Sequence, residues 1–181
     1  MGRILVHEFI SLDGIFEAPH WTMDYPFDPK MGDAIAGIMG GCRGILLGRR
    51  TYEMFAPAWS TRTADEDPGA PFMNDTTKYV VSSKLQTTDA WQNSTIIGPY
   101  SAAGIRDLKA GVDGDLYVSG SGMLVRAMLA DGLVDELHLF VFPVALGSDG
   151  RLFDGATATK FELQSVERYD SGVVHLSYRP R

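Results

Sequence analysis

Short apolar runs alternate with segments of helical spacing along most of this chain, and that alternation restricts the folds open to it. The strand-like runs lie at residues 4–10, 44–47, 79–81, 95–97, 116–118 and 136–144. Helical signals occupy residues 28–41, 51–56, 101–109 and 123–130. Strands that alternate with helices build mostly parallel sheets with helices on both faces. We therefore predict an α/β fold around a mixed, mostly parallel sheet.

The end of the chain departs from this alternation. Residues 161–168 and 173–178 are strand candidates, and the segment Tyr169 to Gly172 between them is typical of a hairpin turn. We predict that these two strands form an antiparallel C-terminal hairpin. The sequence shows no linker and no internal repeat, so a single domain is expected over residues 1–181.

Local signals mark two helix boundaries. Asp28 followed by Pro29 has the form of an N-cap residue and a proline at the first helical position. The helix at residues 51–56 is expected to end at Pro57, and residues 61–71 are expected to form an exposed, acidic loop.

Size and charge limit the possible partners. The chain has 181 residues, of which 45% are hydrophobic, as in one globular domain with a substantial core. Lys and Arg number 16 against 23 Asp and Glu, which gives a net charge of -7. The average field therefore repels nucleic acid, although two well-placed arginines are enough for a small phosphorylated ligand.

Cysteine, histidine and hydropathy patterns exclude other classes. Cys42 is the only cysteine, and the N-terminus becomes charged too early for a signal peptide. No apolar run approaches the ~20 residues that span a bilayer. The histidines lack metal-site spacing, and no Gly-x-Ser-x-Gly turn indicates a serine hydrolase. We expect a cytoplasmic protein that binds no metal and no membrane.

The segment Gly44 to Glu53 carries a specific chemical signal. An apolar strand runs into Gly48, two arginines follow, and a helix begins. Free backbone N–H groups and the positive end of the helix dipole favour an anion there, and Arg49 and Arg50 can add charge-assisted hydrogen bonds. The segment indicates a phosphate site; the alternative is an ordinary turn with two solvated arginines.

Small and polar residues follow several of the predicted parallel strands, at the edge where ligands bind in open sheets. These strand ends are Ser11 to Gly14, Gly48 to Thr51, Ser82-Ser83 and Gly120 to Gly122. At the last of them the backbone can approach a pyrophosphate closely, and Ser121 is a potential N-cap residue. With the two arginines, the set indicates a dinucleotide that carries an extra phosphate, NADP(H) rather than NAD(H). The alternative is that these residues only form turns.

These motifs, in this order, resemble the dihydrofolate reductase-like superfamily. The resemblance rests on Gly48 to Glu53, Ser82-Ser83, Gly120-Ser121-Gly122, and Leu133 to Leu137 leading into Pro143 and Leu146-Gly147. Ser11 to Gly14 is similar to the branch related to the reductase domain of the bifunctional deaminase-reductase of riboflavin biosynthesis. The resemblance spans nearly the whole chain. It implies a three-layer sandwich with a central mixed sheet, NADP(H) as cofactor, and a homodimer.

The resemblance also implies roles for individual residues. Arg49 and Arg50 would hold the 2′-phosphate of the cofactor, Ser82 and Ser83 would flank its adenosine, and residues 120–123 would follow the pyrophosphate and the nicotinamide ribose. The cofactor-binding residues implied in this way are Ser11, Gly14, Gly48, Arg49, Arg50, Thr51, Ser82, Ser83, Gly120, Ser121, Gly122 and Met123.

The substrate side is less explicit. Asp13, next to the nicotinamide, is the candidate catalytic residue that supplies a proton directly or through water, although Asp-Gly is also a common turn pair. Trp21 and Tyr52 are candidates for binding a flat heterocycle, and the alternative is that they pack in the core. Asp33 is near the place of the acidic pterin-binding residue of folate reductases, but it lies about 200° around its helix from Met31, away from the apolar stripe.

The chain lacks the Asp-Asp-Pro type of segment with which riboflavin-pathway reductases hold a ribose phosphate, so neither known substrate is implied. We predict an NADPH-dependent reductase that transfers a hydride to a small heterocyclic substrate, similar to a pterin or a ribosylamino-pyrimidine, or to a carbonyl substrate. The alternative is a non-catalytic NADP(H)-binding module with a regulatory or sensing role.

Overall fold

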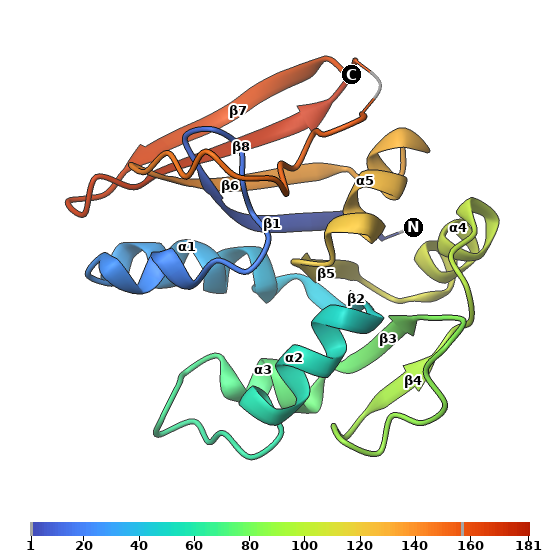
Figure 1. Cartoon of the computed structure of the whole chain (residues 1–181). Helices are drawn as coiled ribbons and strands as arrows, with labels where there is room; N and C mark the ends of the chain where they lie inside the picture. The colour runs from blue at the N-terminus through green and yellow to red at the C-terminus, as the bar shows by residue number, and fades with distance from the viewer. Residues whose placement is uncertain (1, 157) are drawn as a thin grey trace.

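A computed structural model describes residues 2–156 and 158–181 of the chain. Over these residues the strands form one 8-stranded sheet in the order β4-β3-β2-β5-β1-β6-β8-β7 (Figure 1). The strands are β1 (Ile4–Ser11), β2 (Cys42–Gly48), β3 (Thr77–Val81), β4 (Ser94–Ile96), β5 (Asp115–Ser119), β6 (Glu136–Phe142), β7 (Phe161–Arg168) and β8 (Val174–Pro180). β1 to β6 pair in parallel, whereas β8 is antiparallel to both β6 and β7. The predicted mixed α/β sheet and its antiparallel C-terminal pair are confirmed.

Helices cover both faces of this sheet (Figure 1). They are α1 (Pro29–Gly40), α2 (Arg49–Trp59), α3 (Ala70–Asp75), α4 (Ala102–Gly111) and α5 (Gly122–Ala130), with a short 3₁₀ helix η1 (His20–Asp24). α1, α2 and α3 bury Met31, Tyr52 and Met73 against one face, and α4 and α5 bury Ile105 and Val125 against the other. Each face of the sheet therefore has its own apolar core, as a three-layer sandwich requires.

The register of the parallel strands brings their carboxyl ends to one edge of the sheet. Ser11 at the end of β1 pairs with Phe142 at the end of β6, and His7 pairs with Ser119 at the end of β5. Gly48 at the end of β2 pairs with Val81 at the end of β3. The loops that follow these strands meet at this edge, which we call the carboxyl edge.

The start of α1 confirms the predicted cap. The Asp28 carboxylate accepts a hydrogen bond from the backbone N–H of Lys30, and Pro29 occupies the first helical position. This local signal was sufficient because both residues act within one helical turn.

The segment after α2 corrects two predictions. α2 begins at Arg49 and continues through Pro57 to Trp59, and α3 begins at Ala70, so that it takes in the last two residues of the predicted loop. Lys78, on β3 and fully buried, donates to the carbonyls of Met73, Asn74 and Thr76 at the end of α3. These contacts satisfy carbonyls that a short helix leaves free, and Lys78 belongs to another element, so local sequence signals could not reveal them.

No helix within residues 2–156 and 158–181 is long and apolar enough to cross a membrane.

Candidate functional site

The N-terminal turns of α2 and α5 lie side by side at the carboxyl edge. The backbone N–H of Gly48, before α2, donates to Oγ of Ser121, before α5, over 2.7 Å. A Cβ atom built on Gly120 would lie 3.4 Å from Thr51 Cγ2, so the two turns are in van der Waals contact. The structure thus brings together residues from strand ends that are far apart in the sequence.

α2 and α5 differ from α1 and α4 in how they begin, and the short α3 also lacks a side-chain cap. Asp28 caps α1 and Ser101 caps α4 through side-chain hydrogen bonds. At α2 and α5 the residues in the same position, Gly48 and Ser121, make no side-chain cap hydrogen bond. The first N–H groups of α2 and α5 are therefore directed to a place where an anion can accept from them.

Ser121 does not act as the predicted N-cap. It adopts a left-handed conformation, with φ 70° and ψ 55°, and its hydroxyl accepts from Gly48 instead of from its own helix. Gly120 before it also has φ +70°. A Cβ atom on Gly122 would lie 2.6 Å from Phe16 Cζ, so only glycine fits there. These contacts shape the turn 120–122.

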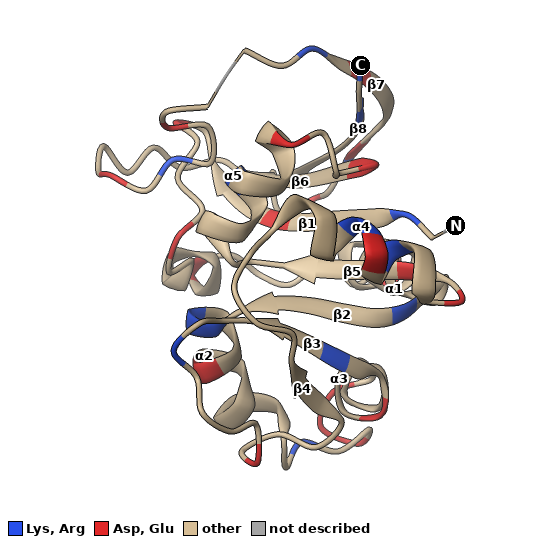
Figure 2. Cartoon of the chain, turned by 90° about the vertical axis from the view of Figure 1, so that its right-hand side faces the viewer, with Lys and Arg blue, Asp and Glu red and all other residues tan. Residues whose placement is uncertain are grey.

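Arg49 and Arg50 supply positive charge beside this turn, and Figure 2 shows the first turn of α2 as basic. Arg49 Nη1 lies 2.7 Å from Glu53 Oε2 in the same helix. Arg50 is exposed and has no ion pair among the described residues. Gly48 pairs with Val81, which places the following residues Ser82 and Ser83 next to the arginines.

Ser82 and Ser83 differ in what they offer. The Ser82 hydroxyl accepts from the backbone N–H groups of Lys84 and Leu85 and so holds its own turn. Ser83 is exposed beside it. The polar groups at this end of the site are therefore Ser83 and the two arginines, which suits an exposed phosphate.

Asp13 forms the centre of a hydrogen-bond cluster at the end of β1. Its carboxylate accepts from the Ser11 hydroxyl at 2.6 Å, from Gly147 N–H at 2.7 Å and from Leu146 N–H at 3.1 Å. The Ser11 hydroxyl and the Gly147 N–H lower the pKa of Asp13 to about 2. The carboxyl is ionised at neutral pH and carries no proton to give, so its geometry fits a positioning role better than the predicted direct proton supply.

Aromatic side chains pack beyond the end of β6, next to Ser11. The ring of Trp21 meets Phe142 edge to face with centroids 5.3 Å apart, and Tyr25 packs on the same ring at 5.4 Å. Trp21 Nε1 is buried and makes no hydrogen bond within the described residues. Trp21 therefore packs against the apolar core, and its Nε1 donor is unused.

The remaining predicted residues differ in where they lie. Tyr52 is buried against Trp91 and its hydroxyl donates to the Thr88 carbonyl, so it is a core residue and does not line the site. Asp33 is exposed on α1 and has no hydrogen bond or ion pair in the described part of the chain. Met123 is 74% exposed on the first turn of α5. Gly14, with φ +87°, turns the backbone toward Arg151.

A family model described as the RibD C-terminal domain matches residues 3–175. The chain belongs to this family. The "uncharacterized protein YyaP" of Bacillus subtilis (strain 168) is 26% identical over 183 residues, which cover 97% of this chain and 94% of that protein.

Solved structures agree with the RibD C-terminal domain assignment. One described as a putative riboflavin biosynthesis protein from Shewanella sp. PV-4 has a TM-score of 0.81 at 20% identity and covers 100% of this chain and 99% of its own. Dihydrofolate reductase from Enterococcus faecalis, in complex with NADP(H) and RAB-propyl, has a TM-score of 0.64 at 12% identity, with 99% and 97% covered. The predicted dihydrofolate reductase-like fold is confirmed, and the family and its neighbours support a reductase.

This RibD C-terminal domain also has residues at the site that the sequence reading missed. Arg126 on α5 donates to the Arg151 carbonyl and to Glu17 Oε1, and its guanidinium lies over the Phe16 ring. Glu8 is 3% exposed within β1. The signal for Glu8 was present, because a carboxylate in an apolar strand is unusual.

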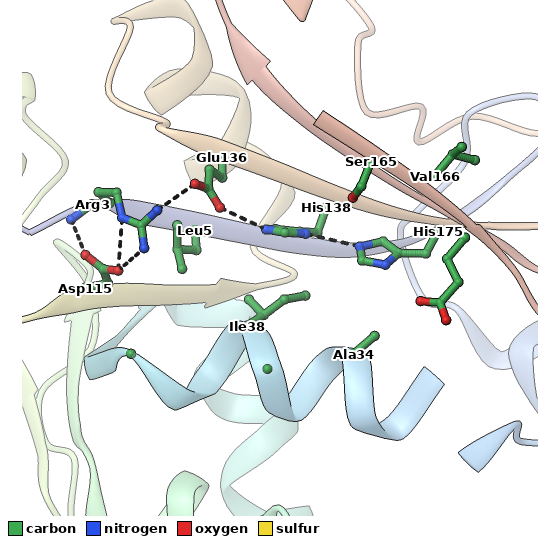
Figure 3. Close-up of a pocket in the computed structure, with 13 residues that line it drawn as sticks. Arg3, Leu5, Ala34, Ile38, Asp115, Glu136, His138, Ser165, Val166 and His175 are labelled. Carbon is green, nitrogen blue, oxygen red and sulfur yellow. Dashed lines mark hydrogen bonds and ion pairs between the residues drawn. The ribbon is translucent and has the colours of Figure 1, made fainter. Parts of the chain in front are cut away.

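A separate cavity of about 550 Å³ lies toward the opposite edge of the sheet, between α1, β6, β8 and β7 (Figure 3). Arg3 bonds to Asp115 and Glu136 at 2.6 Å each, and His138 Nδ1 lies 3.1 Å from His175 Nε2. Burial lowers the pKa of His175 to about 4 and also lowers that of His138. Within the described residues no cluster of three or more His, Cys, Asp or Glu is placed to hold a metal. The cavity wall is a network whose charges are paired internally.

Proposed function

We propose that this protein is an NADPH-dependent reductase of a small heterocyclic substrate, similar to a pterin or a ribosylamino-pyrimidine, or of a carbonyl substrate. The carrying observation is the contact between the uncapped N-terminal turns of α2 and α5, with Arg49 and Arg50 at one end. When bound, NADPH supplies the hydride. For that transfer, the residues of the site would have to bring the nicotinamide and the substrate together so that the two reacting carbons lie about 3 to 3.5 Å apart.

The chemistry of the donors fits NADP(H). The N–H groups of α2 and α5 suit the pyrophosphate, and the guanidinium groups suit the 2′-phosphate at the Ser83 end. Arg49 already pairs with Glu53, so a phosphate would share or replace that contact. Asp13, ionised and bound to Leu146 and Gly147, would hold the loop over the nicotinamide end.

A thermal-shift comparison of NADPH and NADH tests cofactor binding. A ligand at about 100 times its dissociation constant stabilises the folded protein by ~2.7 kcal/mol. We expect NADPH to raise the melting temperature accordingly. Arg49→Ala should weaken NADPH binding about tenfold and leave NADH nearly unchanged, because a charge-assisted contact contributes about 1.5 to 3 kcal/mol. Arg62→Ala, which removes an arginine paired with Asp67 elsewhere, is the control. Equal losses for both nucleotides would contradict the assignment of Arg49.

A non-catalytic NADP(H)-binding module is the second candidate. The ionised Asp13 and the packing of Trp21 and Tyr25 on Phe142 favour it, because they leave no obvious proton donor and fill part of the substrate side. Stopped-flow oxidation of bound NADPH by dihydrofolate, a pterin and a ribosylamino-pyrimidine separates the two candidates. Oxidation of NADPH with any of these compounds supports the reductase. No oxidation with all three favours the non-catalytic module.

We further propose a homodimer, with β7 and β8 as the face that a second copy would cover. β7 is an edge strand, and Leu163 and Val166 on it are 52% and 61% exposed. Edge strands with apolar side chains favour pairing with another chain. Light scattering after gel filtration should give a molar mass of about twice the 19.8 kDa of one chain. Val166→Lys should lower this mass toward that of a single chain. A wild-type mass of a single chain would contradict the dimer.

A further inference from the structure

Two loops at the carboxyl edge are joined to each other. One is residues 13–17, which follow β1, and the other is residues 150–152, which follow β6. The backbone N–H of Leu152 donates to the Gly14 carbonyl over 2.9 Å, and the two loops also form an antiparallel β-bridge. We call these two segments the paired loops. Because they are bonded to each other, whatever holds one of them also restrains the other.

One face of α5 packs against the first of the paired loops. Gly122 and Arg126 are four residues apart in this helix, so they lie on the same face. A Cβ atom built on Gly122 would lie 2.6 Å from Phe16 Cζ and 3.1 Å from Glu17 Oε1. Glycine at position 122 therefore lets the loop lie directly against the start of α5.

Arg126 connects the same face of α5 to both loops. Its Nη2 donates to the Arg151 carbonyl over 2.8 Å and to Glu17 Oε1 over 3.2 Å. Its Nε donates to the Leu152 carbonyl over 3.3 Å, and its guanidinium lies over the Phe16 ring. A guanidinium carries its donors in a rigid fork, so one side chain can bind two successive carbonyls and a carboxylate at once.

This contact reaches Asp13 through one further residue. Arg126 binds the backbone carbonyl of Arg151, and Nε of Arg151 donates to the Asp13 carbonyl over 3.0 Å. α5 itself begins directly after the turn 120–122. Arg126 is therefore the side chain through which the helix behind the proposed pyrophosphate site is bonded to the loops at the proposed nicotinamide end.

We propose that Arg126 is a positioning residue for the nicotinamide end of the cofactor: it docks the paired loops on α5 and so fixes Asp13 relative to the turn 120–122. This inference rests on the proposed NADP(H) site. Loops that are already docked lose less conformational freedom when a ligand binds, which favours affinity. The proposed adenosine end, at Arg49 on α2, has no part in these contacts.

Arg126→Met tests this role with two ligands that differ in the nicotinamide. Met keeps an unbranched side chain on Phe16 and removes the guanidinium. NADPH affinity should fall about fivefold or more, whereas adenosine 2′,5′-bisphosphate, which has the 2′-phosphate but no nicotinamide, should bind within about twofold of wild type. Arg106→Met, at an exposed position of α4, is the matched control and should change neither affinity.

Two milder variants grade the same effect. Arg126→Lys keeps a positive charge beside Glu17 but has no fork for two carbonyls, so its NADPH affinity should lie between those of wild type and Arg126→Met. Glu17→Gln keeps the shape of the loop and removes one charge from the contact, and should weaken NADPH binding about twofold. It repeats the test without altering the helix.

Amide hydrogen exchange of the ligand-free protein tests the docking without any nucleotide. The Leu152 N–H should exchange about tenfold faster in Arg126→Met than in wild type or Arg106→Met, because the paired loops separate more often when α5 does not hold them. Unchanged exchange would overturn the docking. Equal losses of affinity for the two ligands, or no loss for NADPH, would overturn the role at the nicotinamide end.

The two proposals can fail separately. If the wild type binds neither NADPH nor adenosine 2′,5′-bisphosphate, the proposed function fails, and the cofactor role of Arg126 fails with it. The exchange of the Leu152 N–H still decides whether Arg126 docks the paired loops. If the wild type binds both ligands and Arg126→Met loses neither, the NADP(H) site stands and only the role of Arg126 is wrong.

Discussion

The two edges of the sheet use their polar groups in opposite ways. At the carboxyl edge, α2 and α5 begin without side-chain caps, and Ser121 is used to join the two turns. Toward the opposite edge, Arg3 bonds to both Asp115 and Glu136, and His138 contacts His175 (Figure 3). Donors left free in a folded chain indicate a ligand, whereas groups paired with one another contribute to stability. The difference separates the part of the molecule suited to binding from the part that maintains the fold.

Acidification should produce the largest effect, and it acts through three buried histidines, of which His138 and His175 lie toward the opposite edge. His7 has its pKa lowered to about 3 by burial, His175 to about 4, and His138 is shifted in the same direction. Between pH 6.5 and 4 the unfolded chain therefore binds protons that the native state does not. The free energy of unfolding should fall with decreasing pH by up to about 1.4 kcal/mol per pH unit for each histidine. Urea titrations between pH 7 and 4.5 measure the free energy of unfolding at each pH.

A substitution can show which histidine causes the change of unfolding free energy with pH. His175→Phe keeps a ring on Phe140, where the two rings now stack with centroids 4.2 Å apart, and should remove about one histidine's share of the slope. His20→Gln, at an exposed position, is the control for the loss of one imidazole. A slope that is identical in His175→Phe and wild type would mean that the opposite edge does not carry the acid sensitivity.

Ser121→Ala and Ser101→Ala form a matched pair of variants, with a smaller expected effect than that of acidification. Each serine precedes a helix, but Ser101 caps its own helix through Gly104 N–H, whereas Ser121 bonds to Gly48. Both changes should cost about 1 kcal/mol of stability. NADPH affinity should fall several-fold in Ser121→Ala and stay unchanged in Ser101→Ala, by isothermal titration. If both variants bind NADPH with equal affinity, the start of α5 has no more part in nucleotide binding than the capped start of α4.

Gly37→Ala should give the smallest effect, in the opposite direction. Gly37 lies within α1, on the wall of the cavity toward the opposite edge, and an added Cβ atom meets nothing within 4 Å. Alanine in a helix is favoured over glycine by roughly 0.5 to 1 kcal/mol, so the melting temperature should rise. NADPH binding should not change. A loss of stability would show that the cavity wall has no room for a methyl group.

The sequence predicted the elements that local signals define. Strand periodicity and turn residues located the strands, and Asp28 with Pro29 located the start of α1. The prediction was wrong for residues 57–59, where α2 continues, and for residues 70–71, where α3 begins. Lys78 and Asn74 complete those helix ends, and Asn74 Nδ2 donates to the Trp59 carbonyl across the fold.

The candidate site was predictable where it depends on the parallel sheet. Residues at the carboxyl ends of parallel strands must meet, and Gly48, Thr51, Gly120 and Ser121 do meet. Tyr52 was a candidate for substrate binding but packs in the core, because the direction of its side chain depends on how α2 packs against Trp91.

The sequence by itself determined the order of the strands and of helices α1, α2, α4 and α5, the edge at which ligand-binding groups gather, and the two arginines that indicate a phosphate. The tertiary structure decided the chemical state of individual groups. The pKa of Asp13 is lowered to about 2 by the Ser11 hydroxyl beside it and by the N–H groups of Gly147 and Leu146, which lie 134 and 133 residues further along the chain. Secondary structure follows from contacts within a few residues, whereas charge state and hydrogen-bond partners depend on which distant segments the fold brings together.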